Sequence, residues 1–181
     1  MSKVTLIDYD IGNLLSVERA LRHIGADFSV ARSVAEINAA EKLILPVVGA
    51  FASCVNELKE RGFSDAIREA VAQNKPLFGI CVGMQMLFDK SEEFGEHEGF
   101  GFIEGTVKAI PYNDVEGSAQ KIPHIGWTAL TPPEDYEAGW KSPLLEGVPP
   151  STEVYFVHSF AAHPSDDSHR TADSRYGGHR M

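Results

Sequence analysis

Short apolar runs alternate with helical patterns along the first eighty residues. Four of these runs have the length and composition of buried strands: Val4–Ile7, Phe28–Val30, Leu43–Leu45 and Leu77–Ile80. Helical patterns separate them, one after Asn13 and two more around residues 50–60 and 64–73. Strands that alternate with amphipathic helices form a parallel sheet covered on both faces. The pattern therefore predicts an α/β fold built on a parallel sheet.

The first helical pattern has recognisable ends. Asn13 can cap it, and Gly25 can stop it. Its apolar face consists of Leu14, Val17, Leu21 and Ile24. This spacing predicts a helix between the first two strands.

The second half of the chain has a different character. Residues 89–101 are acidic and glycine-rich, which predicts a surface loop. Shorter strand candidates follow at Val107–Ile110, Trp127–Leu130 and Val154–Val157, separated by loops rich in proline and glycine. These strands predict an antiparallel extension of the sheet. The chain shows no internal repeat or interdomain linker, so we expect one domain over residues 1–181.

Composition narrows the possible functions. The 181 residues carry 16 basic and 26 acidic side chains, a formal net charge of −10, without a dense stripe of lysine and arginine. A nucleic-acid partner is therefore not expected. The sequence shows no signal-peptide pattern and no apolar run of membrane-spanning length, and its two cysteines do not make a disulfide framework. We expect a soluble cytoplasmic protein with no membrane partner and reduced thiols.

The segment Gly79-Ile80-Cys81-Val82-Gly83 is the most informative motif. It follows an apolar strand and precedes the helical pattern Met84–Phe88, which is the arrangement of a nucleophile elbow. Glycines two residues before and after the cysteine leave room for a very tight turn. The helix start behind Cys81 favours the thiolate, and the N–H of Val82 is placed to stabilise an oxyanion. Cys81 is therefore the candidate nucleophile.

Each cysteine also has a purely structural interpretation. Cys81 could be a buried cysteine in a glycine-containing turn, because free cysteine is among the most buried residue types. Cys54 recurs with Phe51, Val55 and Leu58 at helical spacing, so it is interpreted as a small apolar residue on a buried helix face.

Three loops at the carboxyl ends of strands are expected to meet near Cys81. They are residues 8–13, residues 46–50 and the elbow itself. Ligands of open α/β sheets bind at this edge. The glycine-containing loop after Leu45 could supply a second oxyanion donor from its backbone.

Taken together, several segments resemble the glutaminase subunits of imidazole glycerol phosphate synthases, which are class I (triad) glutamine amidotransferases of histidine biosynthesis. The elbow alone indicates the wider amidotransferase superfamily. The segments K-I-P-H-I-G-W at 121–127 and Y-F-V-H-S at 155–159 narrow the resemblance to these subunits. The other matching stretches are residues 8–17, 45–51, 76–85 and 176–178, in family order over nearly the whole chain.

The resemblance implies a flavodoxin-like α/β fold with a doubly wound, mostly parallel sheet and an antiparallel extension. It further implies a glutaminase that forms a heterodimer with a (β/α)₈-barrel cyclase and passes ammonia to it. It implies no cofactor. Cys81 would attack the γ-amide of glutamine, and the oxyanion would be stabilised by Val82 and by the loop that contains Val48 and Gly49. Gln85 would help to hold glutamine. The resemblance further assigns the two ends of the substrate to His158, Ser159 and Phe160, and the cyclase-facing surface to Asn13, Lys121, Trp127 and Tyr155.

Several of these residues have simpler interpretations. Gln85 could be a polar residue at a helix start, and periodicity alone favours Trp127 and Tyr155 as ordinary sheet aromatics. The histidines at 158, 163 and 169 lack a compact metal-ligand spacing, so no metal site is expected. Glu96–Glu98 is expected on a solvated loop and Asp166–Asp167 in an exposed turn.

The sequence departs from the family pattern at two places. Val47 stands where the family usually has glycine, and a β-branched residue resists the backbone flip that turns an N–H toward an oxyanion. The family's H-P-E-K segment, which holds the catalytic histidine and glutamate, is absent, and none of the seven histidines is followed two residues later by glutamate in a comparable context. We expect a chain that ends at Met181 without this segment to be less stable than a complete family member and prone to association.

Two functions remain open at this point, with a third less favoured. The chain is either a glutaminase subunit or a binding module that keeps the cyclase-docking surface without turnover. A different cysteine hydrolase on a similar fold, such as the related chaperone and peptidase family, typically has histidine directly after the nucleophile. Val82 argues against that possibility.

Overall fold

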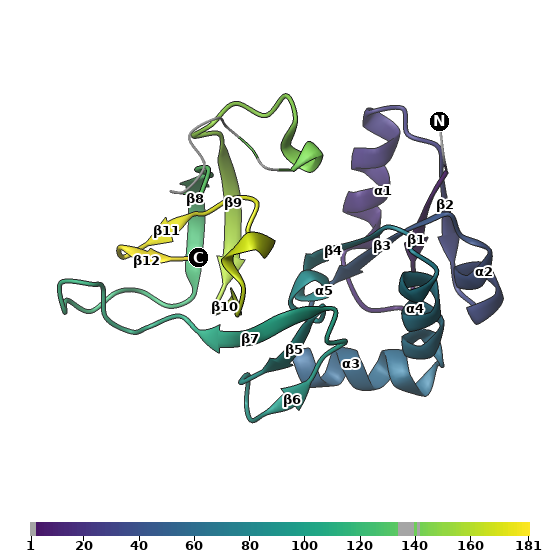
Figure 1. Ribbon diagram of the computed structural model, residues 1–181, viewed down its shortest axis with the longest axis horizontal. Coiled ribbons are helices and arrows are strands. Elements are labelled where there is room, and N and C mark those ends of the chain that lie inside the picture. Colours follow the sequence, from purple (N-terminus) through teal and green to yellow (C-terminus); the bar gives the residue numbers. More distant parts are fainter. Residues whose placement is uncertain (1–2, 134–139, 141) are drawn as a thin grey trace. The chain divides into compact units, whose positions relative to one another are not determined.

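The structure is a computed structural model that describes residues 3–133, 140 and 142–181. It consists of two compact units, Met1–Ile103 and Glu104–Met181. The first unit alternates strands and helices (Figure 1). Its elements are β1 (Val4–Ile7), α1 (Leu14–His23), β2 (Phe28–Ala31), α2 (Val34–Ala39), β3 (Lys42–Val47), α3 (Phe51–Glu60), α4 (Phe63–Ala72), β4 (Leu77–Cys81), α5 (Val82–Gln85), β5 (Phe88–Ser91) and β6 (His97–Glu98).

The first four strands form a parallel sheet in the order β2-β1-β3-β4. The chain moves in one direction across the sheet from β1 to β2, and in the opposite direction from β2 to β3. Because such crossovers are right-handed, this reversal places α1 on one face and the later helices on the other (Figure 1). The α/β fold with a mostly parallel sheet is thereby confirmed. Ligands bind outside the strand ends where the direction reverses, here beside β1 and β3.

The core of the first unit lies between this sheet and its helices. Strand residues such as Ile7, Leu45 and Val47 are almost fully buried, as are Leu58 of α3 and Ile67 of α4. The strand predictions are confirmed within two residues, and so are the two helices around 50–60 and 64–73. Asn13 caps α1 by accepting a hydrogen bond from the Ser16 N–H.

Three expectations for the first unit were wrong in part. The helical pattern after Cys81 stops at Gln85, and Phe88 begins a strand. The segment 89–101 contains the end of β5 and all of β6, which pair as a hairpin, so it is not simply a loop. Ile24 lies at the exposed end of α1, because only the middle of that helix faces the core.

Strand β4 is less buried than its apolar sequence predicts. Within the described part of the first unit it is the last strand on its side of the sheet, so the side chain of Phe78 is 50% exposed.

The capping box at Ser33 and Glu36 explains α2, which sequence reasoning missed: Ser33 accepts from the Glu36 N–H, and the Glu36 carboxylate accepts from the Arg32 N–H.

The second unit is built from antiparallel pairs (Figure 1). Strand β7 (Ile103–Ala109) pairs with β10 (Phe160–Pro164), and β8 (His124–Ala129) pairs with β9 (Glu153–His158). A short hairpin, β11 (Arg175–Tyr176) and β12 (His179–Arg180), follows the single-turn helices η1 (Pro143–Leu145) and η2 (Asp167–His169). The predicted antiparallel strands are therefore present, and each starts one to four residues earlier than expected. They pair in sheets separate from the parallel sheet β2-β1-β3-β4, whereas the sequence predicted that they would extend it.

Strands β8 and β9 expose an apolar face. Their register sets Ile125 opposite Val157 and Trp127 opposite Tyr155, and all four side chains are more than half exposed. The single-domain organisation of residues 1–181 stays a prediction. Among the described residues, no helix has the length and apolar character that a membrane span requires.

Candidate active site

Cys81 occupies a strained turn at the end of β4. Its backbone has φ 57° and ψ −122°, a region that side chains other than glycine rarely adopt. Strain of this kind persists only where the surrounding structure enforces it. The thiol is free and exposed at this turn, between a strand and the one-turn helix α5. These are the features of a nucleophile elbow, in which the reactive atom projects above the sheet.

The two flanking glycines make this turn possible. A methyl group on Gly79 would lie 2.5 Å from the carbonyl oxygen of Gly83, within the turn itself. A methyl group on Gly83 would overlap the carbonyl oxygen of Leu45 in the neighbouring strand β3. Backbone thus surrounds both positions, and backbone cannot move aside as a flexible side chain can. The G-x-C-x-G spacing is therefore a packing requirement of the elbow.

The candidate oxyanion donors lie at the end of β3 and the start of α5. The register of the sheet sets Val47 opposite Cys81, and the exposed Val48 and Gly49 follow at the strand end. Val82 begins α5, where a helix leaves its first N–H groups without intrahelical partners. Val47 itself is buried in the regular strand, with its side chain against Gly83. The position that departs from the family pattern is thus part of the elbow's packing.

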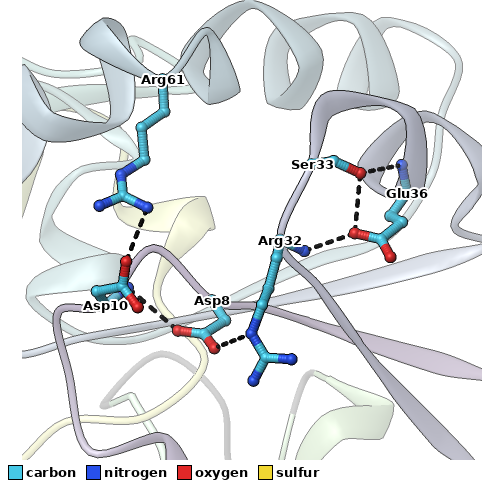
Figure 2. Close-up of polar contacts among 6 residues, drawn as sticks. All are labelled: Asp8, Asp10, Arg32, Ser33, Glu36 and Arg61. Carbon is cyan, nitrogen blue, oxygen red and sulfur yellow. Dashed lines mark hydrogen bonds and ion pairs between the residues drawn. The ribbon is translucent and has the colours of Figure 1, made fainter.

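A network of ion pairs holds the loop between β1 and α1 (Figure 2). Arg32 Nε lies 2.8 Å from Asp8 Oδ2, and the other Asp8 oxygen accepts a hydrogen bond from the Asp10 N–H at 3.1 Å. Arg61 extends from the end of α3 to Asp10 Oδ2 at 3.0 Å. The network connects this loop with the start of α2 and the end of α3. Asn13 is the last residue of the loop before α1. Neither the two arginines nor their pairing could be deduced from sequence spacing.

Gly12 lies where the loop after β1 approaches the loop after β3, which contains Val48 and Gly49 and is called the oxyanion loop below. A side chain at Gly12 would lie 2.7 Å from the Pro46 carbonyl oxygen, so the two backbones approach closely. The loops after β1 and β3 therefore meet as the sequence predicts, next to the strand that carries Cys81.

Behind the oxyanion loop lies Cys54. It is buried in α3, and a side chain on Gly49 would lie 3.0 Å from its sulfur. Burial raises the pKa of the Cys54 thiol, and the charges of Glu93 and Cys81 raise it further, whereas Tyr9 acts in the opposite direction. The structural interpretation of Cys54 is thereby confirmed: it is a protonated core thiol.

Glu93 is a site-adjacent residue that sequence reasoning missed. Its carboxylate accepts the N–H of Phe51 at 2.7 Å, at the start of α3, where Ala50 offers no side-chain cap. This anchors the end of the loop that contains Gly49. From sequence, Glu93 was one of several carboxylates in a segment interpreted as a surface loop. Only the β5–β6 hairpin shows that the chain folds back there, which brings Glu93 to the start of α3. Gln85, one turn after Cys81, is nearly buried in α5.

His158, Ser159 and Phe160 lie in the second unit, where the chain leaves β9, bends at Ser159 and enters β10. Both ring nitrogens of His158 have partners inside this unit: Nε2 lies 2.9 Å from His124 Nδ1, and Nδ1 lies 3.0 Å from the Phe160 carbonyl oxygen. The imidazole of His158 is thus engaged within the second unit through both of its nitrogens. Lys121 contributes its carbonyl oxygen to the Tyr176 hydroxyl.

Within the described ranges, no group of three or more histidine, cysteine, aspartate or glutamate side chains is arranged to hold a metal ion.

Sequence comparison identifies the family. The family model of class-I glutamine amidotransferases matches residues 5–181. The chain belongs to this family. The amidotransferase chain is 44% identical over 178 residues to "Imidazole glycerol phosphate synthase subunit HisH 1" of Legionella pneumophila, covering 98% of this chain and 83% of that protein. It is 41% identical to the HisH subunit of Sulfurimonas denitrificans, covering 96% and 80% of the two chains.

Solved structures show the same fold at low sequence identity. A glutamine amidotransferase crystal structure superposes with a TM-score of 0.70 at 18% identity, covering 96% of this chain and 80% of the other. A putative GMP synthase protein from Thermoplasma acidophilum gives a TM-score of 0.61 at 19% identity, covering 96% and 73%. These likenesses show that the chain has the fold of these amidotransferase structures. Within the class-I family, its sequence is similar to the HisH subunits.

Proposed function

We propose that this chain is the glutaminase subunit of an imidazole glycerol phosphate synthase in histidine biosynthesis. It hydrolyses glutamine to glutamate at Cys81 and delivers ammonia to a cyclase with which it forms a heterodimer. The observation that carries the proposal is Cys81, which is exposed and has a strained backbone. It lies between Gly79 and Gly83, where backbone atoms leave no room for a side chain. The match to the class-I glutamine amidotransferase family supports the substrate, and the HisH relatives, named as subunits of imidazole glycerol phosphate synthase, support the partner.

The chemistry follows from the elbow. The Cys81 thiolate attacks the γ-carbonyl carbon of glutamine, and the carbonyl oxygen becomes an oxyanion that accepts hydrogen bonds from the N–H of Val82 and from the Val48–Gly49 loop. When the tetrahedral intermediate collapses, the C–N bond breaks, and the departing amine takes a proton to leave as ammonia. Water then attacks the glutamyl thioester, releasing glutamate and restoring the thiol. Gln85, one turn after Cys81 in the same unit, helps to hold the substrate.

A second candidate function is a cyclase-binding module that captures glutamine without rapid turnover. The exposed apolar face of β8 and β9 is the observation that favours it, because docking needs that face and no proton transfer at Cys81.

Ammonia release separates the two candidates. The chain is mixed with a cyclase and the ligand of that cyclase, glutamine is added, and ammonia is measured against a Cys81→Ala control. The glutaminase proposal predicts release that depends on both Cys81 and the cyclase. Retained cyclase binding without release above the Cys81→Ala background would favour the binding module instead.

The exposed face of β8 and β9 suits the partner surface. Trp127 is 67% exposed and packs edge-on against Tyr155, which is 55% exposed, beside Ile125 and Val157. Large aromatic side chains dominate binding energy at protein interfaces. Asn13 and Lys121 complete the cyclase-facing set that we propose. The cytoplasmic location and the passage of ammonia through the interface belong to the same proposal.

Substitution of these aromatics is expected to weaken the heterodimer. Trp127→Ala should raise the Kd for the cyclase about 30-fold, which corresponds to about 2 kcal/mol, and Tyr155→Ala about tenfold. Tyr112, also in the second unit and 77% exposed, serves as the matched control, and Tyr112→Ala should leave the Kd within about twofold. Calorimetric titration measures all three. Equal changes of the Kd in Trp127→Ala and Tyr112→Ala would show that the β8–β9 face is not part of the interface.

A further inference from the structure

The chain makes a left-handed turn shortly after β1. Asp10 has φ 66°, a conformation that residues other than glycine adopt infrequently, although aspartate tolerates it better than most. The side chain of Asp8 supports this turn, because its Oδ1 accepts the Asp10 N–H at 3.1 Å. The residues after Asp10 therefore leave the turn in one fixed direction.

Asp8 is itself anchored to the segment after β2 (Figure 2). Its Oδ2 accepts Arg32 Nε at 2.8 Å, and its backbone N–H donates to the Ala31 carbonyl oxygen at 2.9 Å. The backbone N–H of Arg32 donates to the Glu36 carboxylate at 2.7 Å, which ties Arg32 to the start of α2. The Asp8 side chain is only 12% exposed, and charge-assisted bonds to a mostly buried carboxylate are stronger than exposed ion pairs. Asp8 is thus a fixed point at the end of β1.

Arg61, at the end of α3, adds a second support to the turn (Figure 2). Its Nη1 donates to Asp10 Oδ2 at 3.0 Å, and its Nε donates to Glu57 Oε1 at 2.7 Å. The Asp10 side chain is 76% exposed, and ion pairs at exposed positions contribute little free energy. The main support of the turn therefore comes from Asp8.

Ile11 and Gly12 follow the turn and lie against the oxyanion loop. A methyl group on Gly49 would lie 3.9 Å from Cγ2 of Ile11, and a methyl group on Gly12 would lie 2.7 Å from the Pro46 carbonyl oxygen. The two loops thus contact each other closely, with no room for a larger residue at Gly12. The direction in which the chain leaves the turn therefore limits where the oxyanion loop can lie.

The oxyanion loop needs such a support because of the task proposed for it. Strand β3 ends at Val47, which pairs with Cys81, so Val48 and Gly49 lie beyond the paired part of the strand. An oxyanion donor works only when its N–H points to the place where negative charge develops, and loss of one donor costs about 10²–10³-fold in rate. All of these residues belong to the first unit. The neighbours of the loop, and not the sheet, therefore set the positions of these N–H groups.

We infer that Asp8 is a positioning residue for the oxyanion donors: it fixes the turn at Asp10, and the turn seats the residues that follow it against the oxyanion loop. Asp8 touches no reacting atom. Its effect reaches the reaction through the N–H groups of Val48 and Gly49. It should therefore change the rate of attack on a carbonyl group and leave the reactivity of the thiol itself unchanged. This role rests on the proposed function.

Three variants separate the turn from overall stability. Asp8→Ala removes both the acceptor for the Asp10 N–H and the ion pair with Arg32. Asp8→Asn keeps an oxygen for that N–H. Asp8→Ala combined with Asp10→Gly still lacks the acceptor, but it gives the turn a residue that adopts positive φ without strain. Asp27, an exposed aspartate just before β2 at the opposite end of the parallel strands, supplies the control Asp27→Ala.

The rate of attack is measured with the γ-(4-nitrophenyl) ester of glutamate. The Cys81 thiol gives its proton to solvent, and the thiolate attacks the ester carbonyl carbon, whose oxygen becomes an oxyanion. The C–O bond then breaks, which leaves the glutamyl thioester and free 4-nitrophenolate. This leaving group departs without a proton, so the step requires no acid–base group. Alkylation by iodoacetamide is the comparison, because it forms an S–C bond with loss of iodide and develops no oxyanion.

We expect Asp8→Ala to slow acylation at saturating ester about tenfold and to leave the half-saturating concentration nearly unchanged. Asp8→Asn and the double variant should each react within about threefold of the unmodified chain. Asp27→Ala should react within about twofold of it. Alkylation of Cys81 by iodoacetamide should be the same in all five proteins.

Amide NMR tests the geometry without a substrate. We expect the Val48 and Gly49 amide resonances to shift in Asp8→Ala and to return toward their original positions in the double variant. Unchanged acylation in Asp8→Ala, or unchanged resonances of these two amides, would overturn the inference and leave the proposed function intact. Equal slowing of acylation and of iodoacetamide alkylation would also overturn it, because a general structural loss would then explain both. If the ester does not acylate Cys81 even in the unmodified chain, the proposed function fails and the role of Asp8 fails with it.

Discussion

Replacement of Cys81 by glycine is expected to abolish covalent capture of glutamine analogues and, at the same time, to stabilise the fold. The thiol is lost, so no bond to the analogue can form at this position. The backbone at φ 57° and ψ −122° is strained for cysteine but accessible to glycine. Relief of about 1–3 kcal/mol of strain outweighs about 0.5–1 kcal/mol from the greater entropy of unfolded glycine. The free energy of unfolding should rise by about 1 kcal/mol.

Denaturant unfolding and mass spectrometry of the alkylated protein measure the two effects. Cys54→Ala is the matched control, because Cys54 is buried in a regular helix. That variant should lose about 1 kcal/mol of stability and keep its reactivity toward the analogue. A Cys81→Gly protein that is less stable than the original would show that the turn is unstrained. The claim that the elbow holds Cys81 in a strained backbone conformation would then be refuted.

Replacement of Gly83 by alanine is expected to destabilise the chain severely. The added methyl group would overlap the Leu45 carbonyl oxygen and approach a Val47 side-chain methyl group at 3.2 Å. Leu45 and Val47 belong to the buried strand β3, so relief requires β3 and the elbow to separate. We expect the free energy of unfolding to fall by about 3 kcal/mol or more, a large share of a typical domain's stability. Denaturant unfolding measures the loss.

Gly25→Ala provides the comparison for Gly83→Ala. Gly25 ends α1 at φ +68°, and a methyl group there would meet nothing within 4 Å. Its substitution tests the cost of a left-handed residue alone, about 1 kcal/mol. If Gly83→Ala cost no more than Gly25→Ala, the close approach of the elbow to β3 would be refuted.

The first unit could be predicted from sequence because its determinants are local. Asn13 and Gly25 limit α1 by short-range backbone geometry, and the buried strands are continuous apolar runs. The motif around Cys81 predicted a very tight turn, since two glycines at that spacing have few other uses. Helix α2 also had a local signal, the Ser33–Glu36 capping box, which sequence reasoning overlooked.

Other features depend on residues far apart in the chain and leave no short-range pattern. The stop of α5 at Gln85 follows from pairing in the β5–β6 hairpin, which overrides the helical spacing through Phe88. The bond between His124 and His158 joins residues 34 positions apart, and the register of β8 with β9 places them opposite each other. The same register gathers Trp127 and Tyr155 on one exposed face, where periodicity alone favoured ordinary sheet aromatics.

The central claim is that Cys81 is the nucleophile toward glutamine. Alkylation of the unmodified chain with a chloromethyl ketone analogue of glutamine, followed by peptide mass spectrometry, tests it most directly, because this reaction needs neither an acid–base group nor the cyclase. We expect one label, on Cys81, formed more slowly when glutamine is present. A label on Cys54, or labelling of Cys81 that glutamine does not slow, would contradict the claim.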